Sequence, residues 1–518
     1  MNIRMRILGI CLLSLWLALV PPPLSGQDFV PKREFRAAWV ATLTNIDWPS
    51  RKGLTPEEQQ AEFIRILDTL RNMHMNAVIV QVRPKGDAFY RSATEPWSEY
   101  LSGTQGTDPG YDPLAFMVQA AHERGMELHA WLNPFRVTVG EDLSKLSPQN
   151  VGRRHPEWLI RYEGRYYLDP GLYQVRNYLL SVVAELARDY DIDAIHMDDY
   201  FYPYPQGGKP FPDDKSYRSY GATLFGDVAQ WRRDNVNRLI KGLSDTIRAV
   251  RPGLKFGISP FGIYRNVADD PKGSNTRGLS NYDDLYADVV LWAREGWIDY
   301  VLPQLYWENG HPSADFGELL QWWSRHHYKA QLYIGHGVYN ISAGSKKPIW
   351  RTPGEICRQV DMQRLNSSSA GSAFYSVKYL VNNTRGVTDS LRERHYRYMS
   401  LTPAMPSVDA RHPLPPVNVR TESGKNGIKI SWTPGDREGL METDIPSPVR
   451  YYAVYRFAAD EMVNINDVSH LLARVWADGP LEFTDRSAGK GKWVYVVTSV
   501  SASGMENEDF SVAAPAPL

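Results

Sequence analysis

Two adjacent carboxylates suggest the chemistry of this sequence. The segment from Asp193 to Pro203 reads as a short β-strand that ends at Asp198 and Asp199 and continues as an aromatic loop. In a barrel of alternating strands and helices, the C-terminal tips of the strands carry the catalytic groups. Hydrolysis of a glycosidic bond needs one carboxylic acid to protonate the leaving oxygen and a second carboxylate to act at the anomeric carbon. The segment therefore predicts a sugar hydrolase.

Alternation along the strands indicates which side chains accompany these carboxylates. Successive side chains point to opposite faces, so His196 shares a face with Asp198, and Gln304 shares a face of a later strand with Glu308. If these faces point inward, their upper positions converge on one polar pocket that holds Asp198 and Glu308. Asp199 remains an alternative, because alternation can slip at the end of a strand.

These positions lead to a set of expected roles. We expect Asp198 to be the nucleophile or the base that activates water, Glu308 to be the general acid, and Asp199 to orient the substrate. Other polar and aromatic residues are expected to bind sugar hydroxyls or to stack on pyranose rings. They are Arg83, Asp87, His129, Asn133, His196, Tyr200, Tyr202, Tyr204, Gln304, Tyr306 and Trp307.

Several of these residues also have a purely structural interpretation. Asp198 could cap a helix or pair with an arginine, and Glu308 could simply begin a turn in Trp-Glu-Asn-Gly. Asp87 could be a salt-bridge partner within its loop, and His129 and His196 could be hydrogen-bonded core histidines.

Metal and cofactor motifs are scarce in the sequence. No His-x-x-x-His, His-Glu-x-x-His or paired-cysteine spacing occurs, so we expect neither a catalytic zinc ion nor another cofactor. The alternative that the two aspartates and a histidine hold a divalent ion stays open.

Strand and helix patterns alternate along the body of the chain. The expected strands cover residues 35–42, 76–82, 126–132, 192–197, 255–259, 298–306, 330–334 and 371–376. Amphipathic helical segments lie between them, and one begins with the capping box Thr55-Pro-Glu-Glu58. Eight such units predict a closed (β/α)8 TIM-type barrel over residues 32–400. An open doubly wound sheet is disfavoured by the number of units and by the lack of a glycine-rich dinucleotide turn.

The pattern changes near residue 400. Residues 401–416 form a proline-rich linker, and residues 417–518 contain short alternating strands such as Ile428–Trp432 and Trp493–Val500. Their spacing and aromatic residues resemble a fibronectin type III module, a small all-β sandwich.

The N-terminus and the composition indicate export. Arg4 and Arg6 precede an apolar run and a small-residue cleavage site at Gly26, so residues 1–26 read as a signal peptide, and no membrane span is expected after its removal. Cleavage leaves Cys357 as the only cysteine, which fits a bacterial periplasm or exterior. The 58 Lys and Arg residues nearly balance 59 Asp and Glu residues, so no nucleic-acid partner is expected.

Five sequence motifs follow one another in a recognisable order along the chain. They are Phe-Arg-Ala-Ala-Trp-Val-Ala-Thr from Phe35, Val-Gln-Val-Arg-Pro-Lys-Gly-Asp from Val80, His-Ala-Trp-Leu-Asn-Pro-Phe-Arg from His129, Ile-His-Met-Asp-Asp-Tyr-Phe-Tyr-Pro from Ile195 and Pro-Gln-Leu-Tyr-Trp-Glu from Pro303. Together they resemble the glycosyl-hydrolase-10-like family, bacterial proteins once described as a domain of unknown function.

The resemblance implies a (β/α)8 glycoside hydrolase of the cell envelope that acts on peptidoglycan glycan strands. It also implies that His196, Asp198, Asp199 and Tyr200 form the catalytic centre. Two alternatives remain: a glycan-binding envelope protein without turnover, and a glycosidase acting on dietary or host polysaccharide.

Overall fold

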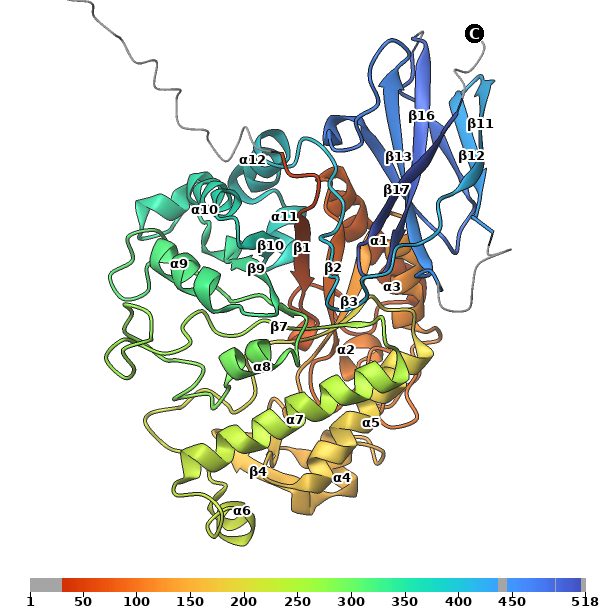
Figure 1. The fold of residues 1–518 in the computed structure, drawn as a ribbon. Helices are drawn as coiled ribbons and strands as arrows, with labels where there is room; N and C mark the ends of the chain where they lie inside the picture. Colours follow the sequence, from red (N-terminus) through yellow and green to blue (C-terminus); the bar gives the residue numbers. More distant parts are fainter. Residues whose placement is uncertain (1–29, 437–444, 490, 514–518) are drawn as a thin grey trace, which may run out of the picture.

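Eight parallel strands close into a barrel, as predicted. The computed structural model describes residues 30–436, 445–489 and 491–513, so the expected signal peptide at 1–26 lies outside the described residues. Around the barrel the strands follow the order β1-β10-β9-β8-β7-β6-β3-β2 (Figure 1). Their bounds are β1 Phe35–Val40, β2 Ala77–Arg83, β3 Glu127–Leu132, β6 Ala194–Met197, β7 Lys255–Ile258, β8 Tyr300–Val301, β9 Gln331–His336 and β10 Ser369–Phe374.

Helices surround the barrel and begin where the sequence places caps. The capping box at α1 is present: Thr55 Oγ1 accepts from the Glu58 amide, and the Glu58 carboxylate accepts from the Thr55 amide. The helices are α1 Pro56–Asn72, α2 Glu99–Ser102, α3 Pro113–His122, α4 Val151–Arg154, α5 Tyr173–Asp189, α6 Asp214–Tyr220, α7 Val228–Val250, α8 Val289–Glu295, α9 Phe316–His326, α10 Gly354–Leu365, α11 Val377–Val381 and α12 Val387–Arg394.

One strand is much shorter than predicted. Residues 298–306 were expected to be extended, yet β8 covers only Tyr300–Val301 and continues as isolated bridges from Gln304 to Phe261 and Gly335. Pro303 explains the break, because proline has no amide hydrogen to donate to the ladder. Alternation beyond this point therefore does not report which side chains face the barrel.

Aromatic rings fill the barrel interior. Phe35 stacks on Tyr333 with ring centres 4.2 Å apart, and Tyr300 packs beside both. Gly257 makes room for Tyr300, since a Cβ at that position would lie 1.9 Å from the tyrosine ring. The interior is thus a packed core, and an open pocket forms only above it.

The residues after 416 form two antiparallel sheets. One sheet holds β11 Val417–Gly424, β12 Gly427–Thr433 and β15 Glu482–Asp485. The other holds β13 Val449–Ala458, β14 Leu471–Trp476, β16 Trp493–Ser501 and β17 Glu506–Ala513. Side chains from both sheets, including Trp432 and Tyr452, share one apolar core. The two sheets are called the sandwich below, and its resemblance to a fibronectin type III module stays a prediction.

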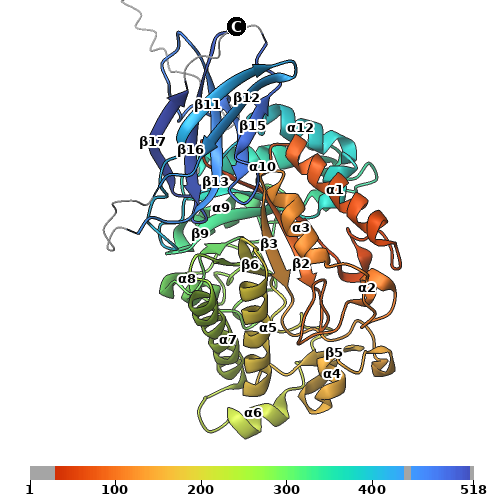
Figure 2. The ribbon, with the colours of Figure 1, turned by 90° about the vertical axis from the view of Figure 1, so that its right-hand side faces the viewer.

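The sandwich lies against the end of the barrel where the strands begin. Arg474 donates to the carbonyl oxygens of Met75 and Ser400 at 2.7 and 3.0 Å, and Met75 lies two residues before the start of β2. The opposite end carries α4, α6 and the hairpin β4 (Leu159–Tyr162) and β5 (Arg165–Leu168) (Figures 1 and 2). No helix among the described residues is long and apolar enough to cross a membrane.

A buried ion-pair cluster joins the start of the first barrel strand to helix α10. Glu34 accepts from Arg36 Nε at 2.6 Å and from Arg364 Nε at 2.8 Å. Burial alone would raise the pKa of Glu34, but the two guanidinium groups outweigh it and lower the pKa. Because Arg364 belongs to α10, which precedes β10, this cluster holds together segments that are distant in sequence.

We predict that Glu34→Ala lowers the free energy of unfolding by about 3–5 kcal/mol, since it leaves buried Arg36 and Arg364 without their carboxylate. Urea unfolding followed by tryptophan fluorescence measures the loss. Glu57→Ala, on the exposed first turn of α1, is the matched control and should change stability by less than about 0.5 kcal/mol. An equal effect of both substitutions would contradict the proposed importance of the cluster.

Candidate active site

A pocket of about 360 Å³ opens at the C-terminal ends of the barrel strands. Residues at or just beyond β1, β3, β6, β7, β8, β9 and β10 line it, so nearly the whole rim of the barrel contributes. The lining residues are Trp39, Trp131, Asp198, Asp199, Tyr200, Tyr204, Ser259, Phe261, Gln304, Tyr306, Trp307, Tyr339 and Tyr375. Polar groups on an aromatic wall suit a sugar ring, which has hydroxyls on its edge and apolar faces.

Asp198 is the more strongly perturbed of the two carboxyls. It lies one residue beyond β6 and is only 5% exposed. Its Oδ2 accepts from Trp131 Nε1 at 3.0 Å, and its Oδ1 accepts from the Tyr200 amide at 3.1 Å. Burial, with the neighbouring charge of Asp199, raises the pKa of Asp198 to about 7. Asp198 therefore carries its proton for much of the time near neutral pH.

Asp199 lies in the same pocket and has different donors. Burial raises the pKa of Asp199, whereas hydrogen bonds from the Tyr204 hydroxyl and the Gln304 amide oppose that rise. A donor to the charged form favours ionisation. The two adjacent carboxyls therefore titrate as a coupled pair with different surroundings.

Arg136 is a nearby cation that the sequence reading did not select. It follows β3, and its guanidinium lies over the Tyr200 ring at 4.8 Å from the centroid. Its positive charge lowers the pKa of both Asp198 and Asp199. Arg136 thus opposes the effect of burial, which favours the protonated forms of Asp198 and Asp199.

The predicted histidines lie beneath the pocket and do not line it. Trp39 Nε1 donates to His196 Nε2 at 3.2 Å, which leaves the proton of neutral His196 on Nδ1, 2.9 Å from Tyr300 Oη. Tyr300 in turn meets His129 Nδ1 at 2.9 Å, and His129 Nε2 meets Glu127 at 3.0 Å. Burial lowers the pKa of His196 well below its usual value, so its ring supports Trp39 as a neutral group.

Glu308 does not join Asp198, so the predicted convergence of these two carboxylates is wrong. Its carboxylate accepts from Lys347 Nζ and from Trp350 Nε1, the latter at 3.0 Å. Partial burial would raise the pKa of Glu308, but these hydrogen bonds lower it. The alternation that suggested its position fails because β8 ends before Pro303. A general acid needs the opposite shift in pKa.

Four other predicted substrate-binding residues are packed away from the pocket. Arg83 is fully buried, where it pairs with Glu95 and donates to the carbonyl oxygens of Asn133 and Pro134. Asp87 contacts Lys85 and Gln105, and Asn133 caps the Arg136 amide. Tyr202 packs against Phe211 and Tyr286. These residues lie behind the pocket and support the rim of the barrel.

The structure brings Tyr200, Tyr204, Gln304, Tyr306 and Trp307 to the pocket, and their binding of substrate stays a prediction. The sequence gave no site role to several other members, which come from five separate strand ends. They are Trp39, Trp131, Ser259, Phe261, Tyr339 and Tyr375. A usable signal existed for two of them, since Trp39 and Trp131 lie inside the motifs that carry the family resemblance.

A closed barrel with a carboxyl pair in an aromatic pocket at its C-terminal rim defines the class of barrel glycoside hydrolases. The profile of the family described as "Glycosyl hydrolase-like 10" matches residues 34–352, and the chain belongs to this family. The resemblance stated from the five motifs is thereby confirmed.

Curated relatives share most of the chain. Glycosyl hydrolase YngK of Bacillus subtilis is 44% identical over 483 residues, which is 92% of each protein. Glycosyl hydrolase DigH of Escherichia coli K12 is 37% identical over 382 residues, 70% of this chain and 86% of DigH.

Solved structures resemble the barrel at low sequence identity. The glycoside hydrolase domain of PgaB (BpsB) from Bordetella bronchiseptica is 15% identical with a TM-score of 0.45, covering 72% of this chain and all of that domain. The catalytic domain of β-amylase from Paenibacillus polymyxa is 13% identical with a TM-score of 0.44, covering 71% of this chain and 99% of that domain.

We predict that Glu308→Gln changes kcat by less than about threefold, because Glu308 lies outside the pocket and is held by Lys347 and Trp350. Turnover on a soluble glycan, measured as new reducing ends, is the readout. A loss comparable to that of a pocket aspartate would restore Glu308 as the acid and refute the assignment to the carboxyl pair.

Proposed function

We propose that this glycoside hydrolase is exported and cleaves glycosidic bonds in peptidoglycan glycan strands, in the periplasm or at the cell exterior. The carboxyl pair Asp198–Asp199 in the aromatic pocket is the observation that carries the reaction class. Export rests on the signal-peptide pattern of residues 1–26. The substrate rests on the resemblance of the five motifs to an envelope family.

Asp198 suits the role of general acid rather than that of nucleophile. A general acid must hold a proton near the working pH and release it to the departing oxygen. The pKa of Asp198, raised to about 7 by burial and by Asp199, meets this requirement. The sequence reading gave Asp198 the nucleophile or base role because it took Glu308 to be the acid.

Asp199 is the second carboxylate of the proposed reaction. Its donors Tyr204 and Gln304 favour the charged form, which is the state this role needs while Asp198 is protonated. A negative charge beside the anomeric carbon stabilises the oxocarbenium-like transition state. The two carboxyls, adjacent in sequence, therefore divide the work through unequal environments.

The walls of the pocket fit a sugar ring. Trp307 packs edge-on against Phe261, and Tyr306 stacks near Tyr375, so several ring faces surround the cavity. Such faces bind the apolar surfaces of pyranose rings. Ser259 Oγ is buried without a hydrogen-bond partner and lines the pocket, which offers a donor and an acceptor to a sugar hydroxyl.

We predict that Asp198→Asn lowers kcat about 10²–10⁴-fold, because it removes the proton donor while keeping the shape of the side chain. The assay is release of reducing ends from peptidoglycan glycan strands with and without their stem peptides. Plant and host polysaccharides are assayed in parallel. If wild type released fragments only from the plant or host polysaccharides, the peptidoglycan proposal would be rejected. If it released fragments from none of the tested glycans, all the proposed substrates would be rejected.

We predict that kcat/KM falls as the pH rises above about 7, by roughly tenfold per unit well above it, because Asp198 then loses its proton. A pH–rate profile between about pH 5 and pH 9 measures the alkaline limb. An alkaline limb below about pH 5 would show that another group is the acid.

The pH dependence of stability tests the raised pKa of Asp198 independently of the activity assay. The folded pKa of Asp198 lies above its usual value of 3.8, so the stability this group contributes is complete below about 3.8 and is lost as the pH rises through about 7. Asp198→Asn should therefore raise Tm relative to wild type more at pH 8 than at pH 4. Asp460→Asn, at an exposed turn of the sandwich, should show no such pH dependence.

A further inference from the structure

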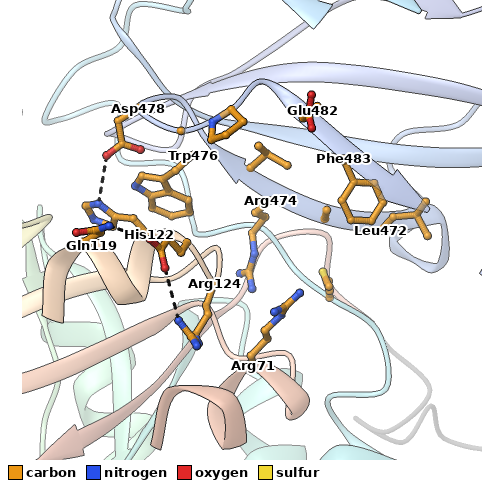
Figure 3. A pocket seen from close by; sticks show the side chains of 16 residues that line it. Arg71, Gln119, His122, Arg124, Leu472, Arg474, Trp476, Asp478, Glu482 and Phe483 are labelled. Atoms are coloured by element: carbon orange, nitrogen blue, oxygen red, sulfur yellow. Dashed lines mark hydrogen bonds and ion pairs between the residues drawn. The ribbon is translucent and has the colours of Figure 1, made fainter. Parts of the chain in front are cut away.

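The sandwich and the barrel enclose a groove of about 750 Å³ at the end of the barrel opposite the active site (Figure 3). At its edge three side chains from distant segments come together: His122 at the end of α3, Asp191 between α5 and β6, and Asp478 between β14 and β15. We propose that His122, Asp191 and Asp478 bind a zinc-type divalent cation that ties the sandwich to the barrel.

The three donor atoms are close enough to share one ion. His122 Nδ1 lies 3.9 Å from Asp478 Oδ2 and 4.0 Å from Asp191 Oδ2, and one atom of each residue lies within 4.8 Å of the others. His122 is only 3% exposed, and its Nδ1 has no hydrogen-bond partner. A buried imidazole nitrogen without a partner, directed at two carboxylates, is an unsatisfied ligand position.

Asp193 and Arg450 both contact the other ring nitrogen of His122. His122 Nε2 lies 3.0 Å from Asp193 Oδ2 and 3.1 Å from Arg450 Nη2, and Arg450 Nε donates to Asp193 Oδ1 at 2.8 Å. In the tautomer in which Nε2 donates to Asp193, Nδ1 presents its lone pair to Asp191 and Asp478. A carboxylate behind the imidazole is the usual outer partner of a metal-binding histidine.

Packing also holds the imidazole ring in place. Trp476 stacks on His122 with ring centres 5.1 Å apart and an interplanar angle of 19°, as Figure 3 shows beside Asp478. Trp476 ends β14, so the sandwich supplies both the ring support and one ligand. The barrel supplies the other two, which makes the proposed site complete only when both parts are docked.

The charges and donor types favour a zinc-type ion. Three carboxylates, Asp191, Asp193 and Asp478, face two guanidinium groups, Arg450 and Arg251, so the charged side chains around His122 sum to a net negative charge. Asp191 Oδ2 accepts from Arg450 Nη1 at 2.6 Å and would share its lone pairs between that donor and an ion. One nitrogen and two carboxylate oxygens with a water complete a tetrahedral set. An imidazole ligand disfavours calcium and magnesium, which select oxygen donors. Asp478 is 61% exposed, so it can move the short distance needed to close around an ion.

The ligands could not be identified from sequence spacing. His122 and Asp191 are separated by helix α5 and the hairpin, and Asp478 lies in another part of the chain. The proposed site is at the N-terminal end of the barrel, so an ion there should stabilise the docked sandwich without entering the hydrolytic reaction.

Titration of the tag-free protein with ZnCl₂ in a calorimeter tests the proposal, with MgCl₂ and CaCl₂ titrated separately. We expect one saturable zinc site per chain and a rise in Tm with added zinc. Asp478→Asn should weaken zinc binding about tenfold or more and reduce the Tm rise, while Asp460→Asn, also exposed on the sandwich, should behave as wild type.

Other results would overturn the site. No saturable heat with zinc, equal affinity in Asp478→Asn and wild type, or binding of calcium as tight as that of zinc would each contradict it. Reducing-end release by Asp478→Asn should equal that of wild type with and without chelator, which separates this proposal from the fate of the proposed hydrolytic function.

Discussion

The burial of two adjacent carboxyl groups at the end of β6 is the constraint on which the site depends. Asp198 and Asp199 leave water at a cost that only specific donors can offset. Trp131 and the Tyr200 amide support Asp198, and Tyr204 supports Asp199. Burial raises the pKa of both carboxyls and different donors oppose the rise at each, so the pKa of Asp198 reaches about 7, the basis on which it is proposed as the acid without a third carboxylate.

The barrel interior keeps this arrangement rigid. Below the pocket, Trp39, His196, Tyr300, His129 and Glu127 form a continuous hydrogen-bonded column, and Lys255 pairs with its last member at 2.6 Å. Each group in the column has a donor or acceptor matched to its neighbour, so burial costs little polar desolvation. The column explains why conspicuous histidines lie near the site without touching the pocket.

The contacts that stabilise the fold and the residues of the candidate active site lie at opposite ends of the barrel. The Glu34 cluster ties the start of β1 to α10, and the sandwich docks where the strands begin, through Arg474 and Arg450. The C-terminal rim is thereby left to the loops that form the pocket. The alternating strand and helix signals, the α1 capping box and the late change to short strands predicted this architecture from sequence. Two features differed: β8 is short, because Pro303 ends its ladder, and the hairpin β4–β5 was not predicted.

The sequence by itself determined the barrel, the family and Asp198–Asp199 as a candidate site, because these rest on local periodicity and contiguous motifs. Tertiary structure alone decided which residues surround that pair. Trp39 and Tyr375 reach the pocket from the first and last strands, whereas Glu308 turns toward Lys347. Strand alternation predicts a facing direction only while the ladder persists. Side chains that follow the last hydrogen-bonded residue of a strand are positioned by closure of the barrel and by loop packing. Neither of these is a local property of the sequence.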